Sequence, residues 1–376
     1  MQPLFPIGRV VPPEDLVGRE PAIAELVNRL LSGQSVIIAG PRRIGKTSVV
    51  EEALRRLRSA GHYAGRVDLL RVTSVQELVE SIADACLGNL TKTRRALHTL
   101  REWVRGRVPE VQFRAALGPH AELALSFAAQ AESRSEGEML EDALALPQEM
   151  AARSGVRFFL AYDEFQEVVK LNSGLLGRMR ALMILQDRVT FVFLGSRESM
   201  IQKLFVKKNE PFYRFAVEWH LPPVPDEAWR SYLLRKYREA GFDPVSETAV
   251  RDLVRLAGGH PMDTMLLANE TVLVARETAA RSISADMVTV AFERTMNSLA
   301  RAFDEVWQDL DDAARHVLKR LAAGEPPYAP PAPNPGRVKR AIDRLLAAGI
   351  LERPARGRYR FVETMFAEHI RRETLA

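Results

Sequence analysis

The sequence predicts an α/β protein in which helices cover both faces of a parallel sheet, followed by a largely helical second half. Short apolar runs alternate with segments of helical periodicity, and strands that alternate with helices usually form a parallel sheet. From residue 226 to about residue 280 the helical segments follow one another without a strand between them. The expected strands are SVIIAG (35–40), RVDLLRV (66–72), VRFFLAYDE (156–164), VTFVFLGS (189–196) and VEWHLPPV (217–224).

The change in pattern divides the chain into three expected parts. Residues 14–224 should form the α/β core, with a helical insertion at about 88–150. Residues 225–282 should form a small helical domain. Residues 283–376 combine helices with a short strand pair and contain a proline-rich connection at 324–336.

Composition excludes several classes of protein. The chain has 376 residues, 47% hydrophobic and 27% charged, which suffices for buried cores in two or three domains. No apolar run approaches the roughly 18 residues of a membrane span, and prolines interrupt the N-terminal segment where a signal peptide needs an apolar stretch. The single cysteine, Cys86, excludes an intramolecular disulfide framework. We therefore expect a cytoplasmic protein with no membrane partner.

A glycine-rich segment after the first expected strand has the pattern of a phosphate-binding loop. Gly40 and Gly45 allow the backbone N–H groups to point at phosphate oxygens, and the helix that begins there adds its positive N-terminal end. Lys46 is then placed for the β- and γ-phosphates, Thr47 for Mg²⁺ and Ser48 for the α-phosphate. The two arginines of the loop either assist the phosphates, remain solvated or contact a neighbouring subunit. The loop comprises Gly40, Pro41, Arg42, Arg43, Ile44, Gly45, Lys46, Thr47 and Ser48.

Two carboxylates stand at the end of the apolar run at 156–164, where open parallel sheets bind their ligands. Asp163 would hold Mg²⁺ together with Thr47, and Glu164 would activate the attacking water as general base. The alternative is an acidic strand end that caps the next helix. Ser196 ends the strand expected between the other two, where it either contacts the γ-phosphate or the water, or caps a helix.

The motifs together resemble the archaeal-type ATPases of the STAND class, a branch related to AAA+ ATPases. The resemblance covers roughly residues 16–270, and the tail from LLAAGILE to YRFVETMF resembles a winged helix. The matching segments are VGRE (17–20), GPRRIGKTS (40–48), YDEFQ (162–166), FLGSRESM (193–200), PFYR (211–214) and GGHP (258–261).

This resemblance implies a three-layer P-loop core, a helical lid and a winged-helix-like C-terminal domain, with ATP and Mg²⁺ bound between core and lid. Val17 and Gly18 would line the adenine pocket. His260 and Pro261 would place the lid against the nucleotide, or simply form the turn before a helix. Arg214 would be an arginine finger or nucleotide sensor, or else form a salt bridge at the domain junction. ATP would act as a switch, with a homo-oligomer as the expected ATP-bound state.

Basic residues gather in two segments that could contact DNA. One runs from Lys92 to Arg107, and the other is a predicted hairpin with Arg353, Arg356, Arg358 and Arg360. Strand alternation would place the last three on one face, where guanidinium groups suit phosphate oxygens. A charge run is also a common solvated surface. The sequence therefore leaves two hypotheses open, an ATP-controlled DNA-binding protein and a signalling ATPase whose tail binds protein or autoinhibits.

Overall fold

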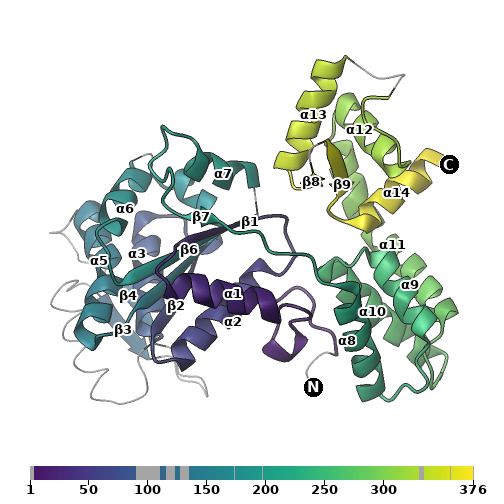
Figure 1. Ribbon diagram of the computed structural model, residues 1–376, viewed down its shortest axis with the longest axis horizontal. Coiled ribbons are helices and arrows are strands. Elements are labelled where there is room, and N and C mark those ends of the chain that lie inside the picture. The colour runs from purple at the N-terminus through teal and green to yellow at the C-terminus, as the bar shows by residue number, and fades with distance from the viewer. Residues whose placement is uncertain are drawn as a thin grey trace.

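The computed structural model describes residues 4–89, 111–115, 123–127, 135–172, 174–196, 198–329, 334–355 and 357–375. It consists of an α/β core, a helical lid and a C-terminal domain (Figure 1). The core sheet has five parallel strands in the order β2-β5-β6-β1-β7. They are β1 (Val36–Ala39), β2 (Tyr63–Asp68), β5 (Phe158–Asp163), β6 (Val189–Gly195) and β7 (Val217–Glu218). The predicted place of β6, between the strands of the phosphate loop and of the acidic pair, is confirmed.

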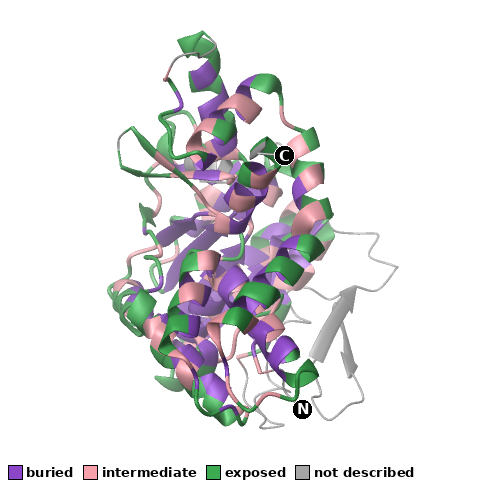
Figure 2. Ribbon diagram, turned by 90° about the vertical axis from the view of Figure 1, so that its right-hand side faces the viewer, coloured by how far each residue is buried: buried purple, intermediate pink, exposed green. Residues whose placement is uncertain are grey.

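Alternate side chains of the strands enter two apolar clusters, one on each face of the sheet. On one face, Ile38 of β1 and Val192 of β6 pack with α1 (Glu20–Leu31) and α2 (Lys46–Ser59). On the other, Ile37 and Phe193 pack with α3, α5, α6 and α7. These helices span Val75–Leu87, Glu136–Ser154, Leu175–Met183 and Glu198–Val206. Figure 2 shows the strands of the core sheet mostly buried, and the helices packed on both faces of that sheet confirm the predicted three-layer core.

The turn after β5 is fixed by aromatic packing. Phe165 begins the short helix η3 (Phe165–Lys170) and is fully buried. Its ring centroid lies 4.6 Å from that of Phe193 on β6 and 5.1 Å from that of Phe212. Aromatic rings at these separations contribute beyond their buried area. The cluster therefore holds the residues that follow Asp163 against the end of β6.

The lid and the C-terminal domain share one apolar cluster. The lid contains α8 (Asp226–Glu239), α9 (Glu247–Ala257) and α10 (Pro261–Glu277), and α11 (Ala285–Gln308) packs against both α10 and α14. The C-terminal domain contains α12 (Asp312–Ala322), α13 (Pro335–Ala347), the antiparallel pair β8 (Leu351–Ala355) and β9 (Arg358–Phe361), and α14 (Thr364–Leu375). This arrangement is winged-helix-like, as expected. Within the described residues no helix combines the length and apolar character needed to cross a membrane.

The insertion at 88–150 differs from the helical expectation. The described residues contain an antiparallel pair, β3 (Val111–Ala115) and β4 (Leu123–Phe127), before α5 begins at Glu136. Alternating segments such as VQFRA are typical of half-buried strands, and the helical prediction gave that alternation too little weight. The basic segment from Lys92 to Arg107 lies outside the described residues.

Candidate nucleotide-binding site

The predicted phosphate loop connects the end of β1 to the start of α2. Gly45 precedes α2 with a φ of 93° and Gly40 has a φ of 154°, both in the region that favours glycine. Lys46 is buried, and its Nζ donates to the carbonyl oxygen of Gly40 at 2.7 Å and to that of Pro41. The amine is therefore held over the loop, at the N-terminal end of α2, where anions bind.

Arg19 supports the loop through a hydrogen bond to its backbone, a role that the sequence did not reveal. Its buried guanidinium donates to the carbonyl oxygen of Ile44 at 2.8 Å and to that of Pro222. Burial lowers the pKa of Arg19 to about 10, so the side chain stays charged at neutral pH. Fixing the Ile44 carbonyl fixes the peptide that leads into Gly45. The only signal in the sequence was the place of Arg19 within the VGRE motif.

The acidic strand end meets the loop as predicted. Thr47 Oγ1 donates to Asp163 Oδ2 at 2.9 Å, and Arg66 Nη1 of β2 lies 3.2 Å from the same oxygen. Burial raises the pKa of Asp163, and the contacts with Thr47 and Arg66 offset only part of that rise. A hydroxyl and a buried carboxylate side by side are hard oxygen ligands, so the residues present fit Mg²⁺. No motif in the sequence points to Arg66.

The Glu164 carboxylate contacts Ser196 at the end of β6, whereas the Asp163 carboxylate contacts Thr47. Glu164 has a left-handed φ of 53°, which is uncommon for a non-glycine residue. Its Oε2 accepts hydrogen bonds from the Ser196 backbone N–H at 3.1 Å, from Ser196 Oγ at 2.7 Å and from Gln166 Nε2. Burial alone would raise the pKa of Glu164, but the hydrogen bonds from Ser196 and Gln166 outweigh it and lower the pKa. Glu164 is thus ionised at neutral pH, as a general base requires.

A cavity of about 710 Å³, within the usual size of a ligand pocket, is lined by most of the predicted nucleotide-binding residues but not by Gly40 or Pro41. The N-terminal segment also lines it, and the Val11 N–H donates to Ser48 Oγ at 3.0 Å. The segment, Trp229 and two lid methionines had not been predicted here. Among the lining residues are Val10, Val11, Val17, Arg42, Arg43, Ile44, Gly45, Lys46, Thr47, Ser48, Asp163, Glu164, Trp229, Pro261, Met262 and Met265.

Residues 16–267 match the family model of an ATPase domain found predominantly in Archaea. The chain belongs to this family of archaeal ATPases. No curated protein sequence matches the chain. Membership of the family implies nucleotide binding, whereas the assignment of this cavity as the nucleotide site and membership of the STAND class stay predictions.

Solved structures with the same fold cover nearly the whole of this archaeal-type ATPase. It is similar to the Walker-type ATPase PABY2304 of Pyrococcus abyssi, with 16% identity over 98% of this chain and 99% of that chain and a TM-score of 0.70. It is also similar to ORC2 of Aeropyrum pernix in its ADPNP-ADP complexes, with 14% identity, coverage of 99% and 98% and a TM-score of 0.59. Cdc6p of Pyrobaculum aerophilum matches with 12% identity, coverage of 98% for both chains and a TM-score of 0.50.

Two residues predicted to contact the nucleotide lie elsewhere in the ATPase. A Cβ on Gly18 would come within 3.0 Å of Ala228, so Gly18 allows the core and α8 to approach each other and does not line the cavity. His260 is buried with its Nδ1 3.4 Å from Asp263 Oδ2. Burial would lower the pKa of His260, but the carboxylates of Asp263 and Glu363 raise it. The packing of α8 and α10, which sets both positions, cannot be read from the motifs.

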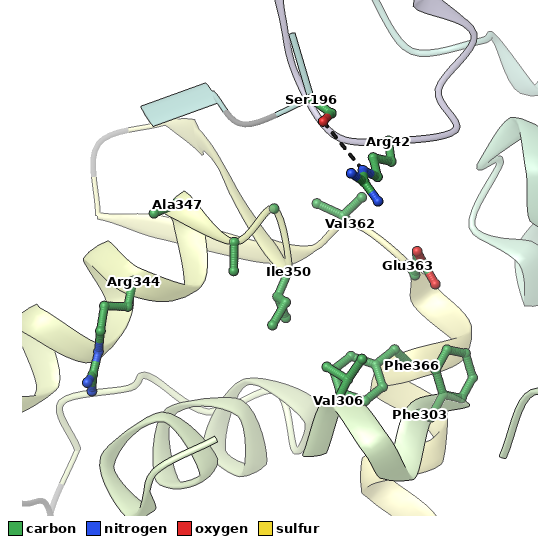
Figure 3. A pocket seen from close by; sticks show the side chains of 12 residues that line it. Arg42, Ser196, Phe303, Val306, Arg344, Ala347, Ile350, Val362, Glu363 and Phe366 are labelled. Carbon is green, nitrogen blue, oxygen red and sulfur yellow. Dashed lines mark hydrogen bonds between the residues drawn. The ribbon is translucent and has the colours of Figure 1, made fainter. Parts of the chain in front are cut away.

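A second cavity, of about 730 Å³, lies between the phosphate loop, α11 and the C-terminal domain (Figure 3). Arg42 and Ser196 form its core side, and Arg42 Nε lies 3.4 Å from Ser196 Oγ. The opposite side includes Arg344, Ile350 and Glu363. Ser196 therefore contacts Glu164 and a loop arginine at the border between the two cavities.

The predicted arginine sites are exposed. Arg214 lies outside the lining of both cavities, with its guanidinium 5.3 Å from the ring centroid of Tyr213, and its role as an arginine finger stays a prediction. On β9, Arg358 and Arg360 are exposed and alternate with the half-buried Tyr359, so their shared face is confirmed. Arg360 pairs with Glu352, and the guanidinium carbon of Arg353 lies 5.4 Å from the ring centroid of Tyr359. Arg356 lies outside the described residues.

Proposed function

We propose that the protein binds and hydrolyses Mg-ATP and that the bound nucleotide controls the position of its C-terminal domain. The observation that carries this proposal is that the phosphate loop contacts both the nucleotide cavity and the C-terminal domain. Lys46 and Thr47 of the phosphate loop face the nucleotide cavity, and Arg43 of the same loop lies 4.0 Å from Glu363 of the C-terminal domain.

The residues divide the chemistry of hydrolysis among them. Lys46 would hold the β- and γ-phosphates through its charge, and Thr47 with Asp163 would hold Mg²⁺. Mg²⁺, when bound, would supply positive charge to the phosphate oxygens. Glu164 lies beside Asp163 at the end of β5, and its ionised carboxylate would orient a water and accept its proton.

The C-terminal domain contacts the phosphate loop through Arg43 and Glu363, where the charge of a bound nucleotide would alter their interaction. The junction is close, because a Cβ on Gly258 of the lid would lie 1.9 Å from Thr364 Oγ1 at the start of α14. Burial raises the pKa of Glu363, and nearby Asp263 raises it further, whereas His260 and Arg43 lower it. ATP phosphates and the Glu363 carboxylate would compete for Arg43. We infer that ATP weakens the docking.

Glu363→Gln should loosen the junction without nucleotide, because it removes the carboxylate that faces Arg43. Hydrogen–deuterium exchange at residues 258–263 and at the start of α14 should become faster. The pattern should resemble that of the wild-type protein with Mg-ATP. Glu352→Gln is the matched control, since Glu352 pairs with Arg360 on the hairpin, and it should leave this exchange unchanged. If the Glu363→Gln variant exchanges as slowly as the nucleotide-free wild type, or if Mg-ATP leaves exchange in the wild type unchanged, the proposed switch is contradicted.

DNA binding is a second candidate function, favoured by the exposed arginines of the β8–β9 hairpin. Replacing Arg353, Arg358 and Arg360 by alanine should weaken DNA binding similarly for all sequences, because phosphate contacts carry no base information. The slope of log affinity against log salt should flatten by about one unit for each lost phosphate contact. The control replaces the exposed Arg251, Arg255 and Arg301. If the hairpin variant binds like the wild type at several salt concentrations, the hairpin is not the interface, and the signalling hypothesis gains.

A further inference from the structure

We propose that Gln166 is a positioning residue, whose side-chain amide and the end of β6 together hold Oε2 of Glu164 and leave Oε1 to meet the attacking water. The inference rests on the proposed role of Glu164 as general base. Three donors converge on Oε2, namely Gln166 Nε2, Ser196 Oγ and the Ser196 backbone N–H. Within the described part of the chain no hydrogen bond is made to Oε1.

The backbone around Gln166 leaves its side chain little choice of direction. Phe165 is fixed in the aromatic cluster, and Glu164 adopts a left-handed φ of 53°. Such a conformation persists only where the surroundings determine it, and it occurs often at functional sites. Gln166 is 1% exposed and therefore reaches inward to β6.

The end of β6 provides the space for this amide. A Cβ on Gly195 would lie 2.6 Å from Gln166 Oε1 and 2.7 Å from Ile201 Cδ1, closer than side chains tolerate. Gly195 does not have a positive φ, so the need for glycine here comes from space and not from backbone conformation. Gly195 thus leaves room for the Gln166 amide, and Ser196 donates to the same oxygen of Glu164 as that amide does.

Burying the Gln166 amide lowers the stability of the fold, which is explained if the amide positions the Glu164 carboxylate. Gln166 Oε1 is buried and has no hydrogen-bond partner among the residues that the structure describes, and an unpaired buried acceptor destabilises a fold. Methionine has a similar shape without polar atoms, and it should fit this site with little or no loss of stability. A residue kept only for stability would not combine a buried unpaired oxygen with a single bond to Glu164.

The test compares Gln166→Met and Gln166→Glu with the wild type in steady-state hydrolysis from acidic to neutral pH. Hydrogen bonds to the ionised carboxylate lower its pKa, so losing the Gln166 donor raises that pKa. Activity needs the ionised form, so the acidic limb of the kcat profile should move to higher pH by about half a unit to one unit for Gln166→Met. Gln166→Glu should move it further, because two adjacent carboxylates share protons. KM for Mg-ATP should stay within about twofold of the wild-type value, because Gln166 does not line the nucleotide cavity.

Gln186→Met is the control, because Gln186 donates at 2.7 Å to the carbonyl oxygen of Leu144, away from the site. Its pH profile should overlay that of the wild type. Ser196→Ala removes another donor to the same oxygen and should shift the limb in the same direction, which provides the test if Gln166→Met fails to fold. An unshifted limb in the folded variants, with Glu164→Gln inactive, would overturn the inference and leave the proposed function standing. Wild-type hydrolysis no faster than that of Lys46→Ala would overturn both.

Discussion

Lys46→Ala should abolish the stabilisation that Mg-ATP gives to the wild-type protein. Lys46 Nζ lies over the phosphate loop, bound to the carbonyl oxygens of Gly40 and Pro41, so its removal leaves the β- and γ-phosphates without their main cation. At a nucleotide concentration 100 times the dissociation constant, the wild type should gain about 2.7 kcal/mol of folding stability. Without nucleotide the variant should unfold within a few degrees of the wild type, because Lys46 belongs to none of the apolar clusters.

Thermal unfolding with and without Mg-ATP measures this difference. Lys170→Ala is the matched control, because Lys170 is an exposed lysine of the same core that pairs with Glu167. It should keep the full nucleotide-induced shift. A Lys46→Ala protein that is stabilised as much as the wild type would show that the nucleotide binds elsewhere.

Glu164→Gln should bind ATP and hydrolyse it about 10² to 10⁴ times more slowly, the range typical for loss of a general base. The substitution keeps the shape of the side chain and an oxygen that can accept from Ser196, but it removes the group that takes the proton. Because the pKa of Glu164 is lowered, the wild-type residue is ionised across neutral pH, and the amide imitates only its inactive form.

Phosphate release under saturating Mg-ATP measures the loss. Glu167→Gln serves as control, since Glu167 lies in the same short helix and pairs with Lys170. That variant should hydrolyse ATP at the wild-type rate. Turnover of Glu164→Gln at the wild-type rate would exclude Glu164 as the base.

The phosphate loop and the acidic pair could be predicted because both depend on local sequence and on one general property of parallel sheets. The loop needs glycines, a lysine and a hydroxyl at fixed spacing between strand and helix. Asp163 stands at the carboxyl end of an apolar strand, and in a parallel sheet such ends lie along one edge. Thr47 and Asp163 were therefore expected to meet, although they lie 116 positions apart in the sequence.

Other parts of the site depend on tertiary contacts that no sequence motif predicts. Arg66 reaches Asp163 across 97 positions of sequence, because β2 and β5 are neighbours in register. Arg19 joins the loop carbonyl of Ile44 to the carbonyl of Pro222, which lies 203 positions from Arg19 in the sequence. His260 was expected at the nucleotide, but the packing of α10 directs it to Asp263 and the C-terminal domain. These positions follow from tertiary packing.

The nucleotide that stays bound after incubation with Mg-ATP and removal of the excess tests hydrolysis at this site most directly. We predict ADP on the wild-type protein, ATP on Glu164→Gln and little nucleotide on Lys46→Ala. ATP left intact on the wild type as on Glu164→Gln, or ADP on all three proteins in equal amount, would contradict the assignment of these residues to ATP hydrolysis.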